Sequence, residues 1–553
     1  MNKTKRAIAG IFGAVLAASV TTTVFAATEH WNDASTAAPS EWSQWKQDWE
    51  TIKNDHEQVS LTPGANETQL NFAWYSKTEE TPAVRISKSA DMSGAVEFGG
   101  TQSEITEEAA IGYFSNKVTV KDLEENTQYY YQVFKNGEWS ETCKYSTKSF
   151  DSYSILYVGD PQIGACKGQT STEGDEMANE IAARNDAFNW NRTLENALSA
   201  HPDVSFMVSA GDQVNTADRE YEYAGYLFPS VLDSLPVSTT IGNHDSGSYQ
   251  YSLHFNNPNS FELNDSKYTL GHTAAGSDYY YTYGDVLFIV IDTNNYNCAT
   301  HKAVIEKAIS ENPDAKWRVV MFHQDIYGSG LDHSDSDGIV LRTQLTPIFD
   351  DNDIDIVLQG HDHTYSRTYQ LSGDGKSHAA YDKSNWRDEN KNPVEGFLTE
   401  NNCYSIRTGA ADGNRVVDPE GIVYMEANSS TGSKFYELIP AQQDYIAERS
   451  QTWTPSYSVI DFSENEATIT TYDALTNKVL EGSAPYTIVK TGNKNASSDN
   501  AEKSDSTENS SDTGNDNKPN PSTGVADTAP IAGIIALAGI AVIVINGVKH
   551  SNK

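Results

Sequence analysis

The stretch "DIDIVLQGHDH", Asp353 to His363, joins an apolar run to a glycine and to two histidines that flank an aspartate. The apolar run predicts a buried strand of a parallel or mixed sheet. Side chains two residues apart lie on the same face of a strand, so His361 and His363 are able to point the same way. Ligand sites in open α/β sheets collect beyond the carboxyl ends of strands. The pair therefore indicates a metal site if other strands supply partners, and an ordinary surface feature if they do not.

Similar apolar strands recur through residues 151–490 and alternate with helical stretches. The predicted strands are "YSILYVGD", "VSFMVSAGD", "PVSTTIGNHD", "VLFIVIDT", "WRVVMFHQD" and "DIDIVLQGHDH". One helical stretch shows an apolar stripe formed by Trp190, Leu194, Ala197 and Leu198. This alternation predicts an α/β layer arrangement. The segment "SYSVIDFSENEATITTYDA" predicts a hairpin that closes the domain near Lys490.

Five of these strands end in carboxylate, amide or imidazole groups. Such groups lose hydration at a sheet edge unless a cation compensates, so ordinary turns explain them poorly. A glycine precedes four of the residues and lets the backbone approach a common centre. We therefore predict a shared metal site. The candidate residues are Asp160, Gln162, Asp212, Asn243, His244, His323, His361 and His363.

Residues 27–150 precede this domain and contain two kinds of pattern. In residues 27–57, Trp42, Trp45, Trp49 and Ile52 fall at helical spacing. This stripe predicts a helical arm packed onto a neighbouring domain, in preference to a carbohydrate-binding surface. Residues 58–150 contain short β segments without intervening helices, which predict a β-sandwich with a structural or substrate-framing role. The predicted fold class is therefore α+β multidomain, a β-sandwich followed by an α/β domain.

The two ends of the chain carry segments typical of targeting signals. Residues 1–26 combine a positive start, an apolar run and a cleavage site after Ala26, as in a secretory signal peptide. Residues 491–519 contain few large apolar side chains and predict a disordered, wall-spanning linker. Residues 520–553 contain "NPSTG", an apolar segment and a basic tail.

The C-terminal segment resembles the sorting signals that sortases cleave before linking a protein to Gram-positive peptidoglycan. The resemblance implies a cell-wall-anchored, extracellular protein, with sortase and peptidoglycan as partners and transient membrane contact through the apolar segment. A plain C-terminal membrane anchor is the alternative, because the apolar run has membrane length and a positive flank. Both alternatives place the protein outside the cell.

Composition limits the possible partners. The formal net charge is −38, which argues against nucleic-acid binding because that function needs a cationic surface. The chain has four cysteines and no C-x-x-C spacing, so it has neither a disulfide scaffold nor a zinc knuckle. One or two disulfide bridges are permitted outside the cell, but the sequence does not require them.

The ordered strand-end motifs, from "VGD" at Asp160 to "GHDH" at His363, closely resemble the calcineurin-like metallophosphoesterase superfamily. The preceding β segments and the phrases "YYYTYGDVLFIVIDT" and "KWRVVMFHQ" resemble its purple-acid-phosphatase-like branch, which has an N-terminal fibronectin-III-like domain. The resemblance covers roughly Gln58 to Lys490. It implies an α/β catalytic sandwich of two mixed sheets flanked by helices.

The resemblance also implies roles for the candidate residues. The first metal would be held by Asp160, Gln162, Asp212 and His363, and the second by Asp212, Asn243, His323 and His361. Asp212 would bridge two cations about 3.5–4 Å apart, and a hydroxide between them would attack phosphorus. His244 would stabilise the transferring phosphoryl group or protonate the leaving alkoxide, and Asp245 would orient it or stabilise its turn. Iron, manganese and zinc, divalent or trivalent, all suit the mixed oxygen and nitrogen ligands.

The predicted function is an extracellular dinuclear phosphoric ester hydrolase, of the acid-phosphatase kind, that cleaves monoesters. His333, Arg342 and Arg367 are candidates for contact with the substrate phosphate, and an exposed loop position is the alternative for His333. A phosphodiesterase with the same metals is one alternative function. A surface binding or adhesion protein with a vestigial metal site is the other.

Two positions depart from the pattern of the family. Many members have histidine where Gln162 stands, and a neutral amide is the weaker ligand, so we expect the first metal to be held loosely. The tyrosinate that colours purple acid phosphatases would lie three residues past Asp212, where this chain has Asn215. We therefore expect metal-replete protein to show no visible tyrosinate-to-iron band. A strong band of this type in its absorption spectrum would contradict the assignment.

Overall fold

The computed structural model describes residues 39–166, 179–261, 272–331, 333–334, 337–378, 400–407 and 413–492. All of them lie within residues 1–494, which form one unit of the chain. The predicted signal peptide, nearly all of the predicted linker and the predicted sorting signal lie outside the described residues. Among the helices of the described ranges, none is long and apolar enough to cross a membrane.

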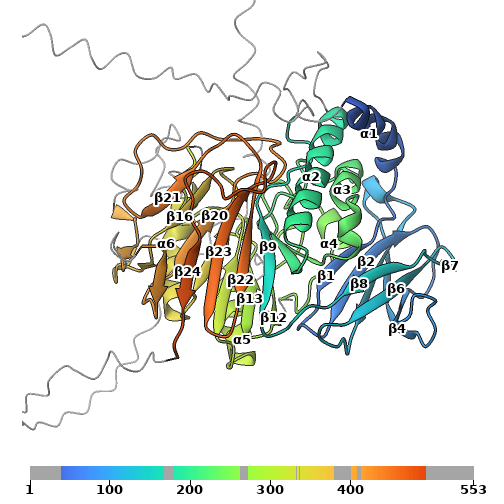
Figure 1. Cartoon of the computed structure of the whole chain (residues 1–553), viewed down its shortest axis with the longest axis horizontal. Helices are drawn as coiled ribbons and strands as arrows, with labels where there is room; N and C mark the ends of the chain where they lie inside the picture. The colour runs from blue at the N-terminus through green and yellow to red at the C-terminus, as the bar shows by residue number, and fades with distance from the viewer. Residues whose placement is uncertain are drawn as a thin grey trace, which may run out of the picture. The chain divides into compact units, whose positions relative to one another are not determined.

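The tryptophan stripe forms helix α1, Pro39–Ile52, as predicted. Its three tryptophans and Ile52 are buried. The indole N–H of Trp45 donates to the backbone oxygen of Arg184 at 2.8 Å. Figure 1 shows α1, in dark blue, beside helices α2 (Glu180–Ala200) and α3 (Glu220–Leu227). The arm is therefore packed onto the domain that follows the β-rich segment.

The β segments of residues 60–146 form an antiparallel domain around an apolar core. The strand order is β1-β2-β5-β4-β3-β6-β7, and β8 pairs with β6. Phe72, Trp74 and Tyr131 are among the side chains buried inside it. The strands are β1 Ser60–Pro63, β2 Leu70–Ser76, β3 Ala83–Ser87, β4 Val96–Glu104, β5 Phe114–Val120, β6 Gln128–Lys135, β7 Glu138–Trp139 and β8 Cys143–Ser146. The predicted all-β N-terminal domain is confirmed.

Two seven-stranded mixed sheets form the following domain. The first has the order β11-β10-β9-β22-β23-β24-β19, and the second β12-β13-β14-β15-β20-β16-β21. The first sheet contains β9 Tyr153–Val158, β10 Val204–Ser209, β11 Val237–Thr239, β19 Arg415–Val417, β22 Ser456–Phe462, β23 Glu466–Asp473 and β24 Tyr486–Val489. The second contains β12 Tyr279–Tyr283, β13 Val286–Val290, β14 Trp317–Met321, β15 Ile356–Gln359, β16 Tyr365–Thr368, β20 Val423–Glu426 and β21 Ile446–Ser450. The predicted hairpin is the antiparallel pair of β22 and β23.

Each sheet is apolar on both faces because it is covered on both sides. Along β9, Ile155 and Tyr157 pack in the core between the two sheets, whereas Leu156 and Val158 pack with residues of α2 and α3. Helices α5 (Cys298–Glu311) and α6 (Asp337–Asp351) cover the outer face of the second sheet. The predicted fold class, a β domain followed by an α/β sandwich flanked by helices, is confirmed.

Strand direction brings the candidate site residues to one edge. Strands β9, β10 and β11 are parallel, and so are β13, β14, β15 and β20. Carboxyl ends of parallel strands lie at the same edge of a sheet. The candidate metal ligands follow β9, β10, β11, β14 and β15 directly.

All four cysteines are free thiols. Cys166, Cys298 and Cys403 are buried, and burial raises the pKa of Cys403 to about 12. A thiol with a raised pKa stays protonated at neutral pH and is a poor nucleophile. The cysteines therefore contribute to packing in this structure.

Candidate metal centre

The candidate ligands sit in turns with an unusual backbone conformation. Asp160, Gln162, Asp212, His361 and His363 all have positive φ, between 38° and 81°. Residues with side chains adopt this left-handed conformation rarely, and they hold it where the surrounding structure enforces it. The backbone at this edge of the sheets is therefore strained at the positions that carry ligand atoms.

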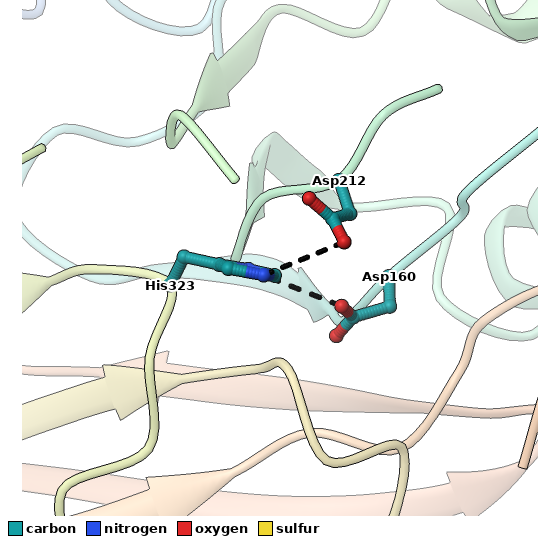
Figure 2. Close-up of side chains that lie close together, drawn as sticks. All are labelled: Asp160, Asp212 and His323. Atoms are coloured by element: carbon teal, nitrogen blue, oxygen red, sulfur yellow. Dashed lines mark ion pairs between the residues drawn. The ribbon is translucent and has the colours of Figure 1, made fainter. Parts of the chain in front are cut away.

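Three side chains converge on the buried imidazole of His323. Its Nε2 lies 2.9 Å from Oδ1 of Asn243, 3.0 Å from Nδ1 of His361 and 3.4 Å from Oδ2 of Asp212. Figure 2 shows Asp160, Asp212 and His323 pointing toward one another. Two imidazole nitrogens and two oxygens that face a common point form a donor set for a cation. These are the four residues to which the family resemblance gives the second metal.

Asp160 and Gln162 form the neighbouring group. Oδ1 of Asp160 lies 3.6 Å from Nε2 of His363. Within the described part of the chain, neither this oxygen nor Oε1 of Gln162 has a hydrogen-bond partner, although both are buried. Leaving a buried polar atom unpaired costs about 1–3 kcal/mol, and a cation between these atoms would remove that cost.

Backbone carbonyls fix the orientation of two imidazoles. Nδ1 of His323 donates to the oxygen of Ala210 at 2.9 Å, and Nδ1 of His363 donates to the oxygen of Lys434 at 2.7 Å. Because a carbonyl oxygen accepts only, each Nδ1 carries a hydrogen, and each Nε2 is the atom left to bind a metal in place of a proton. The rings are therefore held in the tautomer that binds metal.

The glycines before the ligands are required by space, as the sequence predicts. A Cβ at Gly242 would lie 2.0 Å from Oδ1 of Asp212. A Cβ at Gly360 would lie 2.6 Å from Oδ2 of Asp160. Both distances are far below van der Waals contact, so a side chain at either position would displace a ligand carboxylate.

The electrostatics of the cluster show that it needs positive charge. Burial lowers the pKa of His323, but the carboxylates of Asp212 and Asp160 outweigh it and raise that pKa to about 10. Burial raises the pKa of Asp160. Burial and the charge of Lys434 lower the pKa of His363 well below its usual range. Without metal, a proton on His323 therefore supplies the charge that a cation would supply.

The residues present thus fit a pair of cations. The unpaired oxygens of Asp160 and Gln162 belong to one position, and the atoms around His323 belong to the other. Asp212 is placed to serve both, because it faces His323 and lies in one group with Asp160. The chemistry of the donors does not choose among iron, manganese and zinc.

His244 lies beside the cluster and is oriented by two backbone contacts. Its N–H donates to Oδ1 of Asp212 at 2.9 Å, and its Nδ1 donates to the oxygen of Asn215 at 2.7 Å. Nε2 is therefore the ring atom that remains for a substrate. Asp245 instead accepts the backbone N–H groups of Gln213 and Gly242 at 3.1 and 2.9 Å, which is the turn-stabilising role.

The three predicted substrate contacts have different surroundings. The ring centroid of His333 lies 3.8 Å from that of His361, so the structure brings His333 to the ligand cluster. Arg342 is buried, donates to the oxygen of Ile326 and packs over Tyr327. Arg367 is buried, pairs with Glu448 and packs over Tyr486. Contact of these two arginines with substrate stays a prediction.

Asp362, between the two histidine ligands, contacts the loop that carries His333. Its Oδ1 accepts the N–H of His333 at 3.0 Å, and its Oδ2 accepts the N–H of Ser334 at 2.7 Å. It belongs to a second buried carboxylate group with Asp325 and Glu426. Burial and the charge of Asp362 raise the pKa of Glu426 to about 8. The carboxylates of this group accept hydrogen bonds from hydroxyl and backbone donors. They therefore connect the segment that contains Ser329, His333 and Ser334 to Asp362 and to strand β20, which contains Glu426.

The sequence did not single out Lys434 and Tyr436, which also lie at this site. The Tyr436 ring stands edge-on to His363, with centroids 5.3 Å apart. The Lys434 ammonium lies 4.3 Å from the centre of the Tyr436 ring. These residues lie about 70 positions beyond His363 in a loop without a recognisable motif, so nothing local could identify them.

Comparison with known proteins agrees with this arrangement. Residues 153–365 match the family model of the calcineurin-like phosphoesterases, and residues 56–147 match that of the purple acid phosphatase N-terminal domain. Purple acid phosphatase 18 of Arabidopsis thaliana is 22% identical over 330 residues, which cover 57% of this chain and 72% of the relative. A purple acid phosphatase, PPD1, from yellow lupin (Lupinus luteus) seeds has a similar fold, with a TM-score of 0.54 at 13% identity over 78% of this chain and 75% of that one. A purple-acid-phosphatase-like family implies a dinuclear metal centre.

Replacing Gln162 by histidine should strengthen retention of the first metal, because imidazole binds these metals better than a neutral amide. We expect wild-type protein to lose one of two metal ions at a lower chelator concentration than Gln162→His, as measured by elemental analysis after dialysis. The exposed helix residue Gln47 offers the matched control, Gln47→His, which should behave as wild type. Equal retention in Gln162→His and wild type would contradict the assignment of Gln162 as a ligand.

Proposed function

Because this chain is a metallophosphoesterase, we propose that it hydrolyses phosphate monoesters at a two-metal centre. The observation that carries this proposal is the convergence of Asn243, His361 and Asp212 on Nε2 of His323, within 3.4 Å. These residues come from the ends of different strands, and two imidazoles and two oxygens that share one point are a ligand set. Similarity to two purple acid phosphatases supports the choice of monoesters.

The chain's own residues divide the work of the reaction. When bound, the metals supply the Lewis-acid charge that activates water and neutralises phosphoryl oxygens. Asp212 would serve both metal positions, since its Oδ2 faces His323 and it lies in one group with Asp160, while its Oδ1 accepts the N–H of His244. That last contact fixes His244 at the side of the centre. Its Nε2, when protonated, donates to a phosphoryl oxygen or to the leaving alkoxide.

The proposal is tested by wild-type protein and two variants, assayed with nitrophenyl monoester and diester substrates. We expect the wild type to prefer the monoester. Asp212→Asn should lower kcat/KM by more than about 100-fold, because the loss of an outer partner of a metal ligand already costs 10–100-fold. Asp218→Asn removes a carboxylate that is 65% exposed and should leave activity unchanged. A large preference for the diester, or an Asp212→Asn variant as active as its parent, would overturn the proposal.

We further propose that the enzyme acts outside a Gram-positive cell, attached to its wall. Support comes from the signal-like residues 1–26, the polar linker of residues 491–519 and the "NPSTG" motif before an apolar run. Release of the protein by wall-degrading enzymes, but not by detergent, is the expected result. Deleting residues 520–524 should abolish wall attachment, whereas deleting residues 510–514 of the linker should not. Release of the wild type by detergent alone would indicate a membrane anchor instead.

A further inference from the structure

One loop that follows a strand of the second sheet is tied to the residues of the first metal position. Residues 428–436, here called the site loop, follow β20. Ser429 Oγ donates to the backbone oxygen of Asp160 at 3.2 Å, and Thr431 Oγ1 donates to the backbone oxygen of Pro161 at 2.8 Å. The oxygen of Lys434 accepts the Nδ1 hydrogen of His363 at 2.7 Å. The loop is thereby tied to two ligand-bearing segments, so the positions of its own side chains are fixed relative to the metal site.

Two side chains of the site loop form a wall beside the ligands. The Tyr436 ring lies edge-on to His363 at 5.3 Å and to His333 at 6.0 Å between centroids. The Lys434 ammonium lies over this ring and donates to the Tyr436 hydroxyl. Lys434 and Tyr436 are both partly exposed, whereas the neighbouring ligands Asp160 and His363 are buried. A molecule that reaches the ligands from solvent therefore meets a cation that an aromatic ring holds in place.

The charge of Lys434 lies close to the ligand cluster. The ammonium is 4.3 Å from the centre of the Tyr436 ring, and that ring is edge-on to both His363 and His333. The chain as a whole carries a formal charge of −38, so Lys434 places a positive charge in a protein that is mostly negative. Its field favours anions bound at the centre and favours them more as their charge increases.

We propose that Lys434, positioned by Tyr436, contacts the non-bridging oxygens of the bound phosphate and makes the centre selective for monoesters over diesters. A phosphate monoester carries two negative charges near neutral pH, whereas a diester carries one. A fixed ammonium therefore stabilises the monoester more strongly. This inference rests on the proposed phosphatase function and assigns its substrate preference to named residues.

Replacing Lys434 by glutamine removes the charge while keeping a hydrogen-bonding side chain of similar length. Loss of one charge-assisted contact is expected to lower kcat/KM for nitrophenyl phosphate roughly 10–100-fold. The value for bis-nitrophenyl phosphate should change by no more than about threefold, the range of a weak ionic contact. Lys434→Arg keeps the charge and should recover most of the monoester preference. Tyr436→Phe removes the hydroxyl that holds the ammonium and should shift the ratio in the same direction as Lys434→Gln, by less.

The exposed Lys478 provides the matched control, because Lys478→Gln removes the same charge away from the site. It should leave both rates unchanged. Equal losses on the two esters in Lys434→Gln, or no loss on either, would overturn the inference. Metal content of every variant is measured in parallel, and loss of metal from Lys434→Gln would likewise contradict a role confined to substrate.

Binding of inorganic phosphate separates this inference from the proposed function. Titration calorimetry of metal-loaded protein should show phosphate affinity about 10–100-fold lower in Lys434→Gln than in wild type, with Lys478→Gln unchanged. If the wild type hydrolyses neither ester, the phosphatase proposal fails, and weaker phosphate binding by Lys434→Gln still supports the contact. If the esters are hydrolysed and phosphate affinity is the same in all variants, the proposed function stands and the role of Lys434 is overturned.

Discussion

The close approach of the Asp212 carboxylate to the imidazole of His323 is the interaction on which the rest of the site depends. Both side chains are buried, and Nε2 of His323 lies 3.4 Å from Oδ2 of Asp212. A carboxylate withdrawn from water is stable only where positive charge and hydrogen bonds replace its hydration. The N–H of His244 and the imidazole of His323 provide these contacts. A metal cation beside Asp212 would supply the same positive charge. The cation that the proposed reaction needs would therefore also stabilise the buried carboxylate.

The surrounding fold holds this arrangement against its own strain. Left-handed residues such as Asp160 and His361 each cost of order 1–3 kcal/mol and persist only where packing determines their conformation. Here the strands that lead into them are fixed in a core between two sheets and covered by helices on the outer faces. A sheet edge built in this way positions side chains more accurately than loops do.

The loops carry the part of the site that meets solvent. Asp362 accepts the N–H groups of His333 and Ser334, and His363 binds the oxygen of Lys434. Asp362 therefore anchors the loop that carries His333, and His363 anchors the loop that carries Lys434. Metal binding and substrate contact are coupled by these short links, because displacement of His363 would also move the wall of Lys434 and Tyr436.

The sequence by itself determined the fold class and the candidate ligands, because both are written in local patterns. Apolar runs that end in glycine and a polar residue identified Asp160, Asp212 and His361, and the tryptophan spacing identified α1. A metal ligand at the end of a strand is recognised by its residue type and by the apolar run and glycine before it. All of these lie within a few residues of one another in the sequence. Tertiary structure alone decided the surroundings of Arg342, which packs over Tyr327, and the presence of Lys434 at the site. These outcomes arise from contacts between residues 15 to 71 positions apart, here between Arg342 and Tyr327 and between His363 and Lys434, and no local pattern records which distant segments fold together.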